Sequence, residues 1–412
     1  MTKLEELINE LCPDGVEYKT VGEVCTIKKG AQLNRDKLKD NGLYPVVNGG
    51  VNPSGYWDEY NFNANLITIS QGGASAGYVN FMTTPFWAGA HCYVVEKCEE
   101  CLNYTYLYHF IKMHQKTFMQ CQYGAGIPSL SLKSINAIGI PLPPLSIQSE
   151  IVHILDSFTL LTAELTAELT ARQKQYAFYR DYLLDFSDED VTKKTPDIDC
   201  SNVEYIKLKD VCKIGDGLHS TPIYDNNGSY YFINGNNLEN GRITFTENTK
   251  RINISQYERY KIELDDATIL MSINGTIGKI ALYNREPIIL GKSVAYFNVN
   301  ERILKKYLYY LLQTNRSNAY YEKNLTGSTI KNLGLKALRE YQIPLPPIDV
   351  QKNIIKILDR FDKLNNDMSE GLPAEIEARK KQYEYYRDTL LSFDDKACSQ
   401  IVKVERERAN TH

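Results

Sequence analysis

The sequence has no long apolar segment and no start typical of a leader peptide. No run approaches the roughly eighteen consecutive apolar residues of a membrane-spanning helix. The opening Met-Thr-Lys-Leu-Glu-Glu lacks the apolar core of a signal peptide. The 412 residues, of which 43% are hydrophobic, otherwise have the composition of an ordinary globular protein with two to four domains. We therefore expect a soluble, cytoplasmic protein without a membrane partner.

The sequence also lacks the motifs of common catalytic sites. It has no P-loop, no His-Glu-x-x-His and no Gly-x-Ser-x-Gly with a credible base. Adenine methyltransferases need an Asn/Asp-Pro-Pro-Tyr/Phe turn, but the Pro-Pro pairs here, in Leu142–Leu145 and Leu345–Ile348, have apolar neighbours. Gln122–Gly126 resembles a cofactor-binding glycine loop, but the equivalent Thr326–Thr329 lacks the second glycine. We therefore predict a non-catalytic protein without a cofactor.

The cysteines favour neither a disulfide framework nor a metal site. There are nine, an odd number, and they are scattered along the chain. Cys98-Glu-Glu-Cys101 is the one metal-like spacing, and it lacks a second Cys-x-x-Cys. Conceivable further ligands are His91, Cys92, His109, His114 and Cys121. We favour a polar turn before a helix over zinc, and we predict no bound metal.

A formal net charge of −4 is not typical of a DNA-binding domain that acts alone. A DNA complex shared with a basic partner nevertheless needs only local positive surface. One basic cluster consists of Lys28, Lys29, Arg35, Lys37 and Lys39. The cluster is either such a surface or a solvated charged loop.

The most informative feature of the sequence is an internal duplication. Ile140-Pro-Leu-Pro-Pro-Leu-Ser-Ile-Gln148, the first proline phrase, returns 203 residues later as Ile343-Pro-Leu-Pro-Pro-Ile-Asp-Val-Gln351. A tyrosine phrase, Arg172–Phe186, returns 207 residues later as Arg379–Phe393. Nearly identical repeated segments that flank divergent sequence indicate that the repeated segments have the same role in both halves, whereas the divergent segments have different roles.

The repeat also reaches the start of each half. Gly15–Tyr18 matches Asn202–Tyr205, and Cys25 and Cys212 then occupy equivalent places, as buried reduced cysteines would. The middles, numbered 44–118 and 230–322, show little convincing identity. The parts that differ between the halves therefore lie in their middles.

Each proline phrase leads into a long helix. Proline has no amide donor and biases the preceding residue toward extended backbone, so the phrase itself is neither helix nor central strand. The apolar residues that follow recur at intervals of three, four and seven, which predicts one amphipathic helix per half. They include Ile151, Ile154, Phe158, Leu161 and Leu165, and in the second copy Ile354, Ile357, Phe361, Leu364 and Met368.

A helix over residues 147–187 would be about 60 Å long at about 1.5 Å per residue, more than a compact domain needs. Its natural partner is the equivalent helix over residues 349–394, and a shared apolar seam predicts an intramolecular coiled coil. We favour antiparallel pairing, which lets each helix end near the opposite globular part. Gly371 and Pro373 predict a kink or a restart in the second helix.

The middles predict mixed α/β domains. Strand-like runs occur at Leu66–Ser70, Tyr93–Val95, Ile269–Ile273 and Lys279–Tyr283, and helical stretches at Tyr104–Gln120 and Leu304–Lys323. The expected fold is two globular α/β domains separated by two long antiparallel helices, with an internal pseudo-twofold duplication. The expected order is a first domain (1–146), a helix (147–187), a linker (188–201), a second domain (202–348), a helix (349–394) and a tail (395–412).

The sequence resembles the specificity subunit of type I restriction-modification enzymes over nearly its whole length. The resemblance rests on Cys12–Tyr18, on Pro-Leu-Pro-Pro-x-x-x-Gln before each helix, and on Arg-x-Lys-Gln-Tyr-x-x-Tyr-Arg-Asp-x-Leu-Leu in each tyrosine phrase. It implies two target-recognition domains that each read one half of a bipartite, asymmetric sequence in double-stranded DNA. It also implies helices that dock two copies of a methyltransferase (modification) subunit, and a restriction/translocase subunit in the full complex.

The antiparallel helices would relate the two halves by a twofold axis that matches the pseudo-dyad of a DNA duplex. Half-sites one helical turn apart lie about 34 Å apart, so the helices would act as a ruler. Two alternatives remain: the specificity subunit of a type IIB restriction enzyme, which has a similar duplicated design, and a coiled-coil scaffold without DNA binding.

Candidate site residues follow from the chemistry of each task. Base edges are read by Arg, Lys, Asn or Gln, and phosphates by basic or hydroxyl groups on loops. The DNA-binding candidates are Lys28, Lys29, Arg35, Asn48, Gln71, Ser75, Asn234, Asn236, Asn237, Lys250, Arg251, Asn274 and Lys279. The candidates for the coiled coil and partner docking are Ile151, Ile154, Phe158, Leu161, Tyr176, Tyr179, Ile354, Ile357, Phe361, Leu364, Tyr383 and Tyr386.

Overall fold

The computed structural model describes residues 3–120, 128–187, 193–195, 198–199, 202–366 and 371–393. The chain divides into two compact units, Met1–Leu165 with Ile376–His412, and Thr166–Glu375. The glycine loop Gln122–Gly126, most of the predicted linker and the predicted tail lie outside the described residues. In the described part of the chain, no helix is both long and apolar enough to cross a bilayer.

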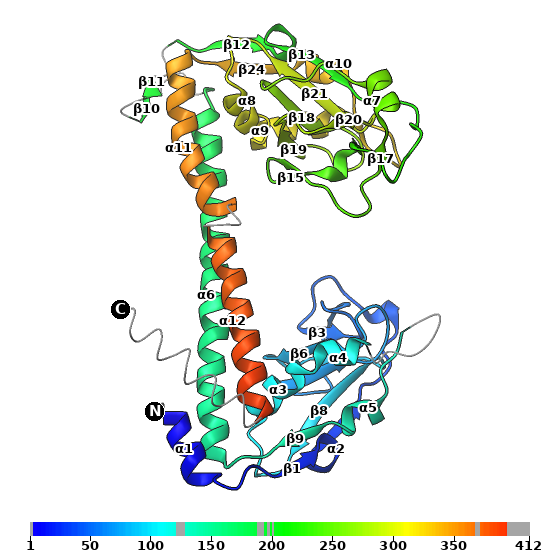
Figure 1. Cartoon of the computed structure of the whole chain (residues 1–412), viewed down its shortest axis with the longest axis vertical. Coiled ribbons are helices and arrows are strands. Elements are labelled where there is room, and N and C mark those ends of the chain that lie inside the picture. The colour runs from blue at the N-terminus through cyan, green and yellow to red at the C-terminus, as the bar shows by residue number, and fades with distance from the viewer. Residues whose placement is uncertain are drawn as a thin grey trace. The chain divides into compact units, whose positions relative to one another are not determined.

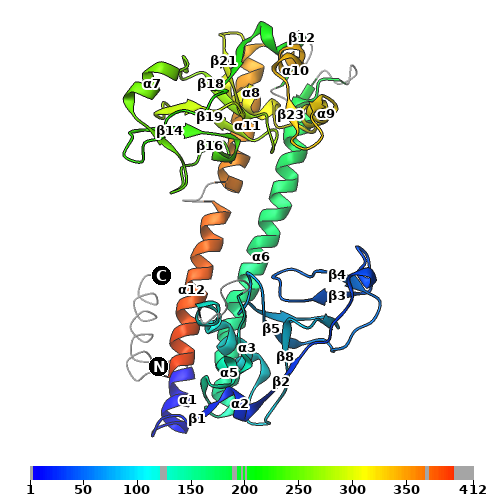
Figure 2. The same ribbon diagram turned by 90° about the vertical axis from the view of Figure 1, so that its right-hand side faces the viewer.

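The first unit contains two sheets (Figure 1, Figure 2). One has the order β2-β8-β5-β6 and is antiparallel throughout, and the other has the order β4-β3-β7, with β3 and β7 parallel. The strands are β2 (Cys25–Lys29), β3 (Tyr44–Val47), β4 (Gly55–Trp57), β5 (Leu66–Ser70), β6 (Val79–Met82), β7 (Trp87–Ala88) and β8 (Cys92–Cys98). The helices are α1 (Lys3–Leu11), α2 (Val21–Val24), α3 (Tyr104–Met113), α4 (Gln115–Gln120) and α5 (Leu132–Asn136), with a 3-10 turn η1 at Arg35–Lys37.

The second unit repeats this plan. Its sheets have the orders β13-β21-β18-β19 and β17-β14-β20, and β14 and β20 are again parallel. The strands are β13 (Cys212–Asp216), β14 (Tyr230–Ile233), β17 (Arg251–Ile252), β18 (Thr268–Ser272), β19 (Ile280–Leu282), β20 (Ile288–Leu290) and β21 (Val294–Val299). The duplication therefore extends through the middles, where the sequence shows little identity.

The remaining elements of the second unit are short. The helices are α7 (Ile254–Tyr260), α8 (Lys305–Leu311), α9 (Asn315–Lys323) and α10 (Leu335–Glu340), with 3-10 turns η2 (Leu208–Asp210) and η3 (Gly235–Asn237). Paired two-residue strands are β15 (Leu238–Glu239) with β16 (Arg242–Ile243), and β22 (Leu325–Thr326) with β23 (Asn332–Leu333). β10 (Lys193–Thr195) pairs with β11 (Ile198–Asp199). The predicted strands and helices of both middles are confirmed.

The repeated segments at the start of each half pair with the proline phrases. β1 (Tyr18–Thr20) is antiparallel to β9 (Gly139–Pro141), with Tyr18 opposite Pro141. β12 (Glu204–Lys207) is antiparallel to β24 (Gln342–Leu345), with Tyr205 opposite Pro344. Proline is tolerated in an edge strand because the amide that it lacks would point away from the partner strand and would form no hydrogen bond in the ladder. Each domain is thus closed by a ladder between its two repeated ends.

The glutamine at the end of each proline phrase ties the long helix to the domain. Gln148 is fully buried, its Nε2 donates to the carbonyl oxygens of Cys101 (2.9 Å) and Pro143 (2.7 Å), and its Oε1 accepts from the amide of Asn103 (2.8 Å). Gln351, also fully buried, makes the same three bonds, to Arg302 (3.1 Å), Pro346 (2.9 Å) and the amide of Leu304 (2.8 Å). Asn103 and Leu304 cap α3 and α8, so each glutamine joins the starts of two helices.

Replacing Gln148 by Leu, which keeps the size of the side chain, should destabilise the first unit strongly. The substitution leaves three backbone groups without their partner, and each buried unpaired group costs about 1–3 kcal/mol. We expect a loss of at least about 3 kcal/mol in urea unfolding of the full chain. Gln175→Leu, at an exposed position of the same helix, is the control and should change stability by less than about 0.5 kcal/mol. Equal effects of the two substitutions would contradict this role of Gln148.

The long helices are α6 (Leu145–Leu184), α11 (Ile348–Asn366) and α12 (Leu372–Ser392). The restart predicted at Gly371 and Pro373 is confirmed, because α12 begins at Leu372. Within the first unit α12 runs antiparallel to α6: the carbonyl of Ser392 accepts from the Tyr18 hydroxyl beside the start of α6, and Tyr386 lies against Phe158 farther along it. Within the second unit α11 also lies beside α6 (Figure 1).

Each unit joins the proline-phrase helix of one half to the tyrosine phrase of the other. In the first unit Phe158 stacks on Tyr386, with ring centres 5.1 Å apart. In the second unit Phe361 stacks on Tyr179, with ring centres 5.5 Å apart. Phe361 is the repeat equivalent of Phe158, and Tyr386 that of Tyr179. Each half therefore contributes its tyrosine phrase to the unit of the other half, and Phe158 and Phe361, two residues of the predicted seam, stack on tyrosines of these phrases.

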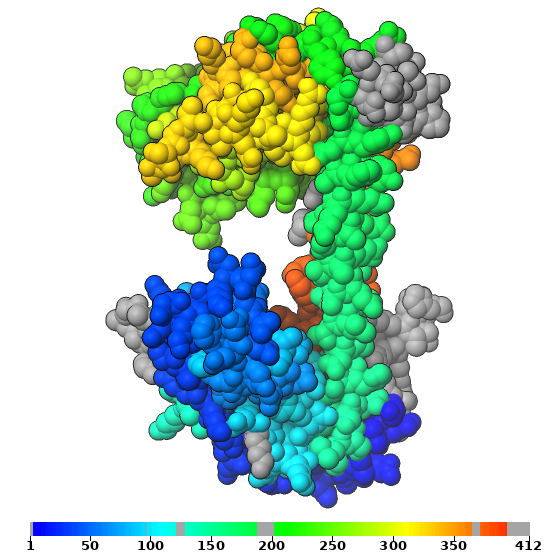
Figure 3. Space-filling model, turned by 180° about the vertical axis from the view of Figure 1, so that it is seen from behind, coloured from blue at the N-terminus to red at the C-terminus, as the bar shows by residue number. Residues whose placement is uncertain are grey.

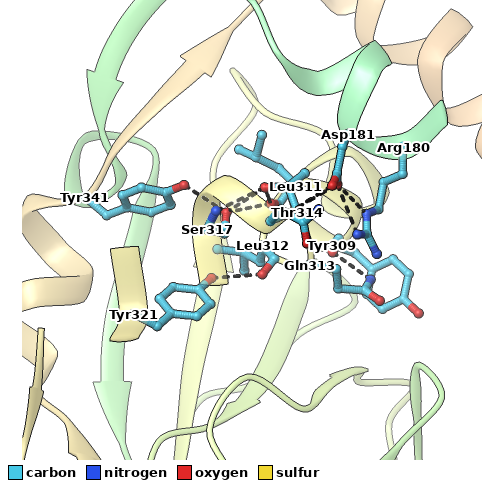
Figure 4. Close-up of polar contacts among 11 residues, drawn as sticks. Arg180, Asp181, Tyr309, Leu311, Leu312, Gln313, Thr314, Ser317, Tyr321 and Tyr341 are labelled. Atoms are coloured by element: carbon cyan, nitrogen blue, oxygen red, sulfur yellow. Dashed lines mark hydrogen bonds and ion pairs between the residues drawn. The ribbon is translucent and has the colours of Figure 1, made fainter. Parts of the chain in front are cut away.

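The Arg-Asp pair of the tyrosine phrase has a structural role in the second unit (Figure 4). The Arg180 guanidinium donates to the Asp181 carboxylate at 3.0 and 3.1 Å and lies 5.7 Å from the centre of the Tyr176 ring. Asp181 accepts from the amide of Asn315, 3.4 Å away at the first residue of α9. A carboxylate is stabilised at the N-terminus of a helix, so the phrase fixes α6 to α9.

Candidate nucleic-acid interface

Four loops meet beside the sheets of the first unit and hold one another through backbone hydrogen bonds. We name residues 48–50, 71–75, 89–91 and 128–130 the first loop frame. The amide of Gly89 donates to the carbonyl of Val47 (2.8 Å), and that of Gln71 to His91 (2.8 Å). The amide of Gly73 donates to Pro128 (3.0 Å), and that of Leu130 to Gln71 (2.8 Å). These bonds need no particular side chain.

The second unit has the same frame. We name residues 234–237, 273–277, 291–293 and 331–333 the second loop frame. Its four corresponding bonds run from the amide of Gly291 to Ile233 (2.8 Å), Ile273 to Ser293 (2.9 Å), Gly275 to Lys331 (3.0 Å) and Leu333 to Ile273 (2.9 Å). The correspondence equates Gln71 with Ile273, His91 with Ser293 and Pro128 with Lys331.

In each frame, one position must be glycine because an asparagine side chain lies too close to leave room for a Cβ atom. A Cβ atom on Gly89 would lie 2.4 Å from Oδ1 of Asn48, and one on Gly291 would lie 2.3 Å from Oδ1 of Asn234. In the first frame Asn48 Oδ1 also accepts from the amide of His91 (3.1 Å). In the second, Asn234 Oδ1 accepts from the Ser293 hydroxyl (3.0 Å). The two predicted asparagines thus hold equivalent positions and help to build the frame.

The side chains on these matched backbones differ. The first frame presents an exposed imidazole at His91, where the second has the hydroxyl of Ser293. Gly72 corresponds to Asn274, whose Nδ2 donates to the carbonyl of Lys292 (3.1 Å). Ser129 and Pro128 correspond to Asn332 and Lys331. A constant backbone with changed hydrogen-bonding groups can present two different recognition surfaces.

A polar cavity adjoins the first frame. Its volume is about 700 Å³, and Gln32, Arg35, Asn48, Ser54 and His91 contribute to its lining. It brings together the predicted Arg35 and Asn48. Gln71 lies in the same frame, and its Oε1 is buried without a hydrogen-bond partner among the described residues. The arrangement combines one cationic group with several amide and imidazole donors.

The other predicted residues of the first unit lie in different settings. Lys28 and Lys29 are exposed on β2, and Lys28 forms an ion pair of 2.5 Å with Glu96 on β8. Lys39 forms an ion pair with Asp58, and both Lys37 and Lys39 lie over the Trp57 ring. Ser75 lies in a turn of the frame, where its backbone carbonyl accepts a hydrogen bond from the amide of Tyr78.

The predicted residues of the second unit fall into three groups. Asn234, Asn236, Asn237 and Asn274 lie in the frame, but Asn237 is buried and its amide nitrogen donates to the carbonyl of Thr244 and the hydroxyl of Thr249. Lys250 and Arg251 are exposed beside the β14 sheet, over the rings of Tyr224 and Tyr231. Lys279 is half-buried and lies immediately before β19.

Sequence reasoning missed several polar groups at the frames. They are Gln32 of the adjoining cavity and, in the frames, His91, Lys292, Ser293, Lys331 and Asn332. The glycines that precede His91 and Lys292 were a usable signal, because glycine between two strands marks a loop or a close approach. The correspondence between the two frames itself was not visible, because it rests on backbone bonds rather than on identity.

Each tyrosine phrase has some aromatic side chains that pack inside its unit and others that are exposed to solvent. Tyr176, Tyr383 and Tyr386 pack inside their units, and the Tyr383 hydroxyl bonds to Nδ1 of the buried His109 (2.9 Å). Phe178 and its repeat equivalent Tyr385 instead point outward, with 65% and 45% of their surface exposed. Figure 3 shows one face of α6 bare of other described segments. Exposed aromatic rings on a helix are typical of a protein interface.

The Cys98-Glu-Glu-Cys101 segment forms the polar turn before a helix that the sequence favours: Cys98 ends β8, a turn follows, and α3 begins at Tyr104. Cys121, one of the conceivable further ligands, lies outside the described residues. Within the described ranges, no three His, Cys, Asp or Glu side chains lie close enough together to hold a metal ion.

The chain is similar to known proteins over most of its length. The sequence profile of the type I restriction modification DNA specificity domain matches twice, at residues 13–172 and 200–378. The EcoR124I/EcoR124II type I specificity subunit of Escherichia coli is 35% identical over 274 residues, 64% of this chain and 65%, slightly under two thirds, of that protein. A putative type I specificity subunit of Haemophilus influenzae is 30% identical over 396 residues, 92% of this chain and 96% of that one.

Solved structures share the fold. The crystal structure of the type I restriction-modification S subunit from M. genitalium covers 92% of this chain and 96% of its own, with a TM-score of 0.50 and 19% identity. A chain from a study of complex assembly and conformational transition in the type I R-M system covers 92% of this chain and 98% of its own, with a TM-score of 0.57 and 16% identity. With its two matched domains, the chain belongs to the family of type I restriction-modification specificity subunits.

Proposed function

We propose that this chain is the non-catalytic, DNA-reading subunit of a type I restriction-modification complex. Each domain reads one half of a bipartite, asymmetric target in double-stranded DNA through its loop frame. A modification subunit carries out the methyl transfer, and a restriction/translocase subunit completes the full complex. The observation that carries the proposal is the pair of loop frames, which share their backbone bonds but differ in the side chains that they present.

The chemistry of the frames supports a division of labour. Imidazole, amide and hydroxyl groups such as His91, Asn274 and Ser293 suit base edges. Exposed lysines and arginines near the frames, such as Lys29, Lys250 and Lys331, suit phosphates, which position a protein on the duplex without reading its sequence. Local basic groups allow this although the net charge of the chain is −4.

Substitution of His91 tests the assignment of the first frame. A base contact carries about 1–3 kcal/mol of discrimination, so His91→Ala should lower methylation of the natural site about 10- to 100-fold or relax one base of one half-site. The readout is the methylated motif made by the full chain with its modification subunit. The control is His153→Ala, an exposed histidine on α6 outside the frame, which should leave the motif intact. An unchanged motif together with an unchanged level of methylation from His91→Ala would remove His91 from the reading surface.

Two outward aromatic positions are proposed to dock two modification subunits. Phe178 and Tyr385 are repeat equivalents, so they offer one equivalent surface in each unit. Truncating a central aromatic contact at an interface often costs more than about 2 kcal/mol. Phe178→Ser should therefore reduce the modification subunits that co-purify from two copies to one, and Phe178→Ser with Tyr385→Ser should remove both.

The matched control for docking is Leu160→Ser. Leu160 is 62% exposed on the same helix, but its repeat equivalent is Lys363, so it belongs to no duplicated apolar surface. The mass of the purified complex gives the copy number directly. Two copies bound to the doubly substituted chain would place docking elsewhere.

A further inference from the structure

Two cysteines face each other at one end of the β2-β8 ladder. Cys25 is the first residue of β2 and lies directly opposite Cys98, the last residue of β8. Their sulfur atoms are 3.6 Å apart. Directly opposite residues of an antiparallel pair have Cβ atoms about 4.5–5.5 Å apart, and a disulfide needs about 3.5–4.5 Å, so a small shift at this strand end suffices. We propose that Cys25 and Cys98 form a reversible disulfide in response to peroxide.

Small oxidants can reach the pair. Both side chains are half-buried and border an open cavity of about 680 Å³ that is also lined by Glu99 and Cys101. The strand end and the turn after Cys98 form part of this lining. A buried structural cysteine is inert because no reagent reaches it, whereas a redox-sensitive one is accessible and has a nearby resolving thiol.

The two thiols have different parts in the reaction. The Cys25 thiol donates to the Cys98 sulfur, and this hydrogen bond lowers the pKa of Cys98 and raises that of Cys25. The Cys98 thiolate therefore attacks one peroxide oxygen. The O–O bond breaks, a proton completes the departing water, and Cys98 becomes a sulfenic acid. The Cys25 sulfur then displaces that hydroxyl as a second water, so two thiols and one hydrogen peroxide give one disulfide and two waters.

The second unit shows that the fold does not require this pair. Cys212, the repeat equivalent of Cys25, begins β13 and lies opposite Val299, the last residue of β21. Cys212 is buried, and burial raises the pKa of its thiol. An apolar side chain is therefore sufficient at the position of Cys98. The facing thiols distinguish the first domain from the second.

The bond would constrain most of the first domain. Cys25 and Cys98 are 73 residues apart, and the segment between them contains strands β3 to β7 and three loops of the first loop frame. A bridge across a loop of this length stabilises the folded state mainly by restricting the unfolded chain. We expect oxidation to raise the Tm of the first unit by roughly 5–10 °C. This inference does not depend on what the loops bind.

The test uses the reduced full-length chain treated with hydrogen peroxide. Free thiols are then alkylated, the chain is digested, and cross-linked peptides are identified by mass spectrometry, with and without dithiothreitol. We expect a Cys25–Cys98 cross-link that dithiothreitol removes. Cys25→Ser and Cys98→Ser should each abolish it, whereas Cys101→Ser and Cys212→Ser should leave it unchanged. The Tm of each reduced variant verifies that it is folded.

Three results would overturn the inference. One is a cross-link that joins Cys98 to Cys101 or to Cys12 in place of Cys25. Another is oxidation of Cys98 beyond the sulfenic acid while Cys25 stays open to alkylation. The third is a Cys25–Cys98 cross-link that forms only after the chain is unfolded with urea.

Discussion

Replacing residues 208–340 by the corresponding segment of a related specificity subunit should change one half of the methylated sequence and leave the other half unaltered. The segment contains the second loop frame and both sheets of the second unit. The exchange keeps the β12-β24 ladder native. It also keeps Gln351, whose partners in the exchanged segment are the backbone groups of Arg302 and Leu304, which a related segment also supplies. The chimera should therefore fold and assemble with the native modification subunit.

The reciprocal exchange of residues 21–138 is the control. It retains the β1-β9 ladder and Gln148, and it should change only the half-site that the first chimera preserved. Both motifs are read by sequencing methylated DNA from a host that lacks other methylation. A change in both half-sites from either exchange, or in neither, would contradict the assignment of one domain to one half-site.

Duplicating Thr162–Leu165 in α6 should lengthen the spacer between the half-sites without changing the bases read. Phe158 anchors α6 to the first unit, and Tyr179 anchors it to the second, so the insertion lies between the two anchors. Four helical residues add about 6 Å, nearly two base-pair rises of about 3.4 Å. They also turn the helix by about 400°, close to a full turn, so both anchors keep their faces.

A two-residue insertion at the same place separates length from rotation. It turns the helix by about 200°, which moves one anchor to the opposite face, and it should damage folding or assembly. The chain already contains a second copy of the duplicated segment, Thr166–Leu169, so the four-residue variant extends an existing pattern. An active four-residue variant with an unchanged spacer would refute the role of α6 as a ruler.

The helices and the duplication were predictable from the sequence because their signals are local. The proline phrases excluded helix where β9 and β24 lie, and the apolar intervals after them predicted α6 and α11. Gly371 and Pro373 predicted the restart at Leu372, because both residues disfavour a helix interior. The role of Gln148 was not predictable, since its partners Cys101 and Asn103 lie more than forty residues away in sequence.

The loop frames and the exchange of tyrosine phrases escaped sequence reasoning for physical reasons. The frames are held by backbone amides and carbonyls, so side chains there can diverge while the backbone stays the same. The contact of Phe158 with Tyr386 depends on which helix ends meet, which the helical period alone does not determine. Seven of the thirteen predicted DNA-binding residues lie in the frames, and one of these seven, Asn237, is buried. The other six are Asn48, Gln71, Ser75, Asn234, Asn236 and Asn274.

The most direct test of the central claim is the methylated motif that the unaltered chain gives with its modification subunit. Both are expressed in a host without other DNA methylation, and every methylated base is mapped by single-molecule sequencing. Two different loop frames on one chain predict a bipartite motif whose two half-sites differ in sequence and are separated by unspecified bases. A continuous or palindromic motif, or methylation that is independent of this chain, would contradict the claim.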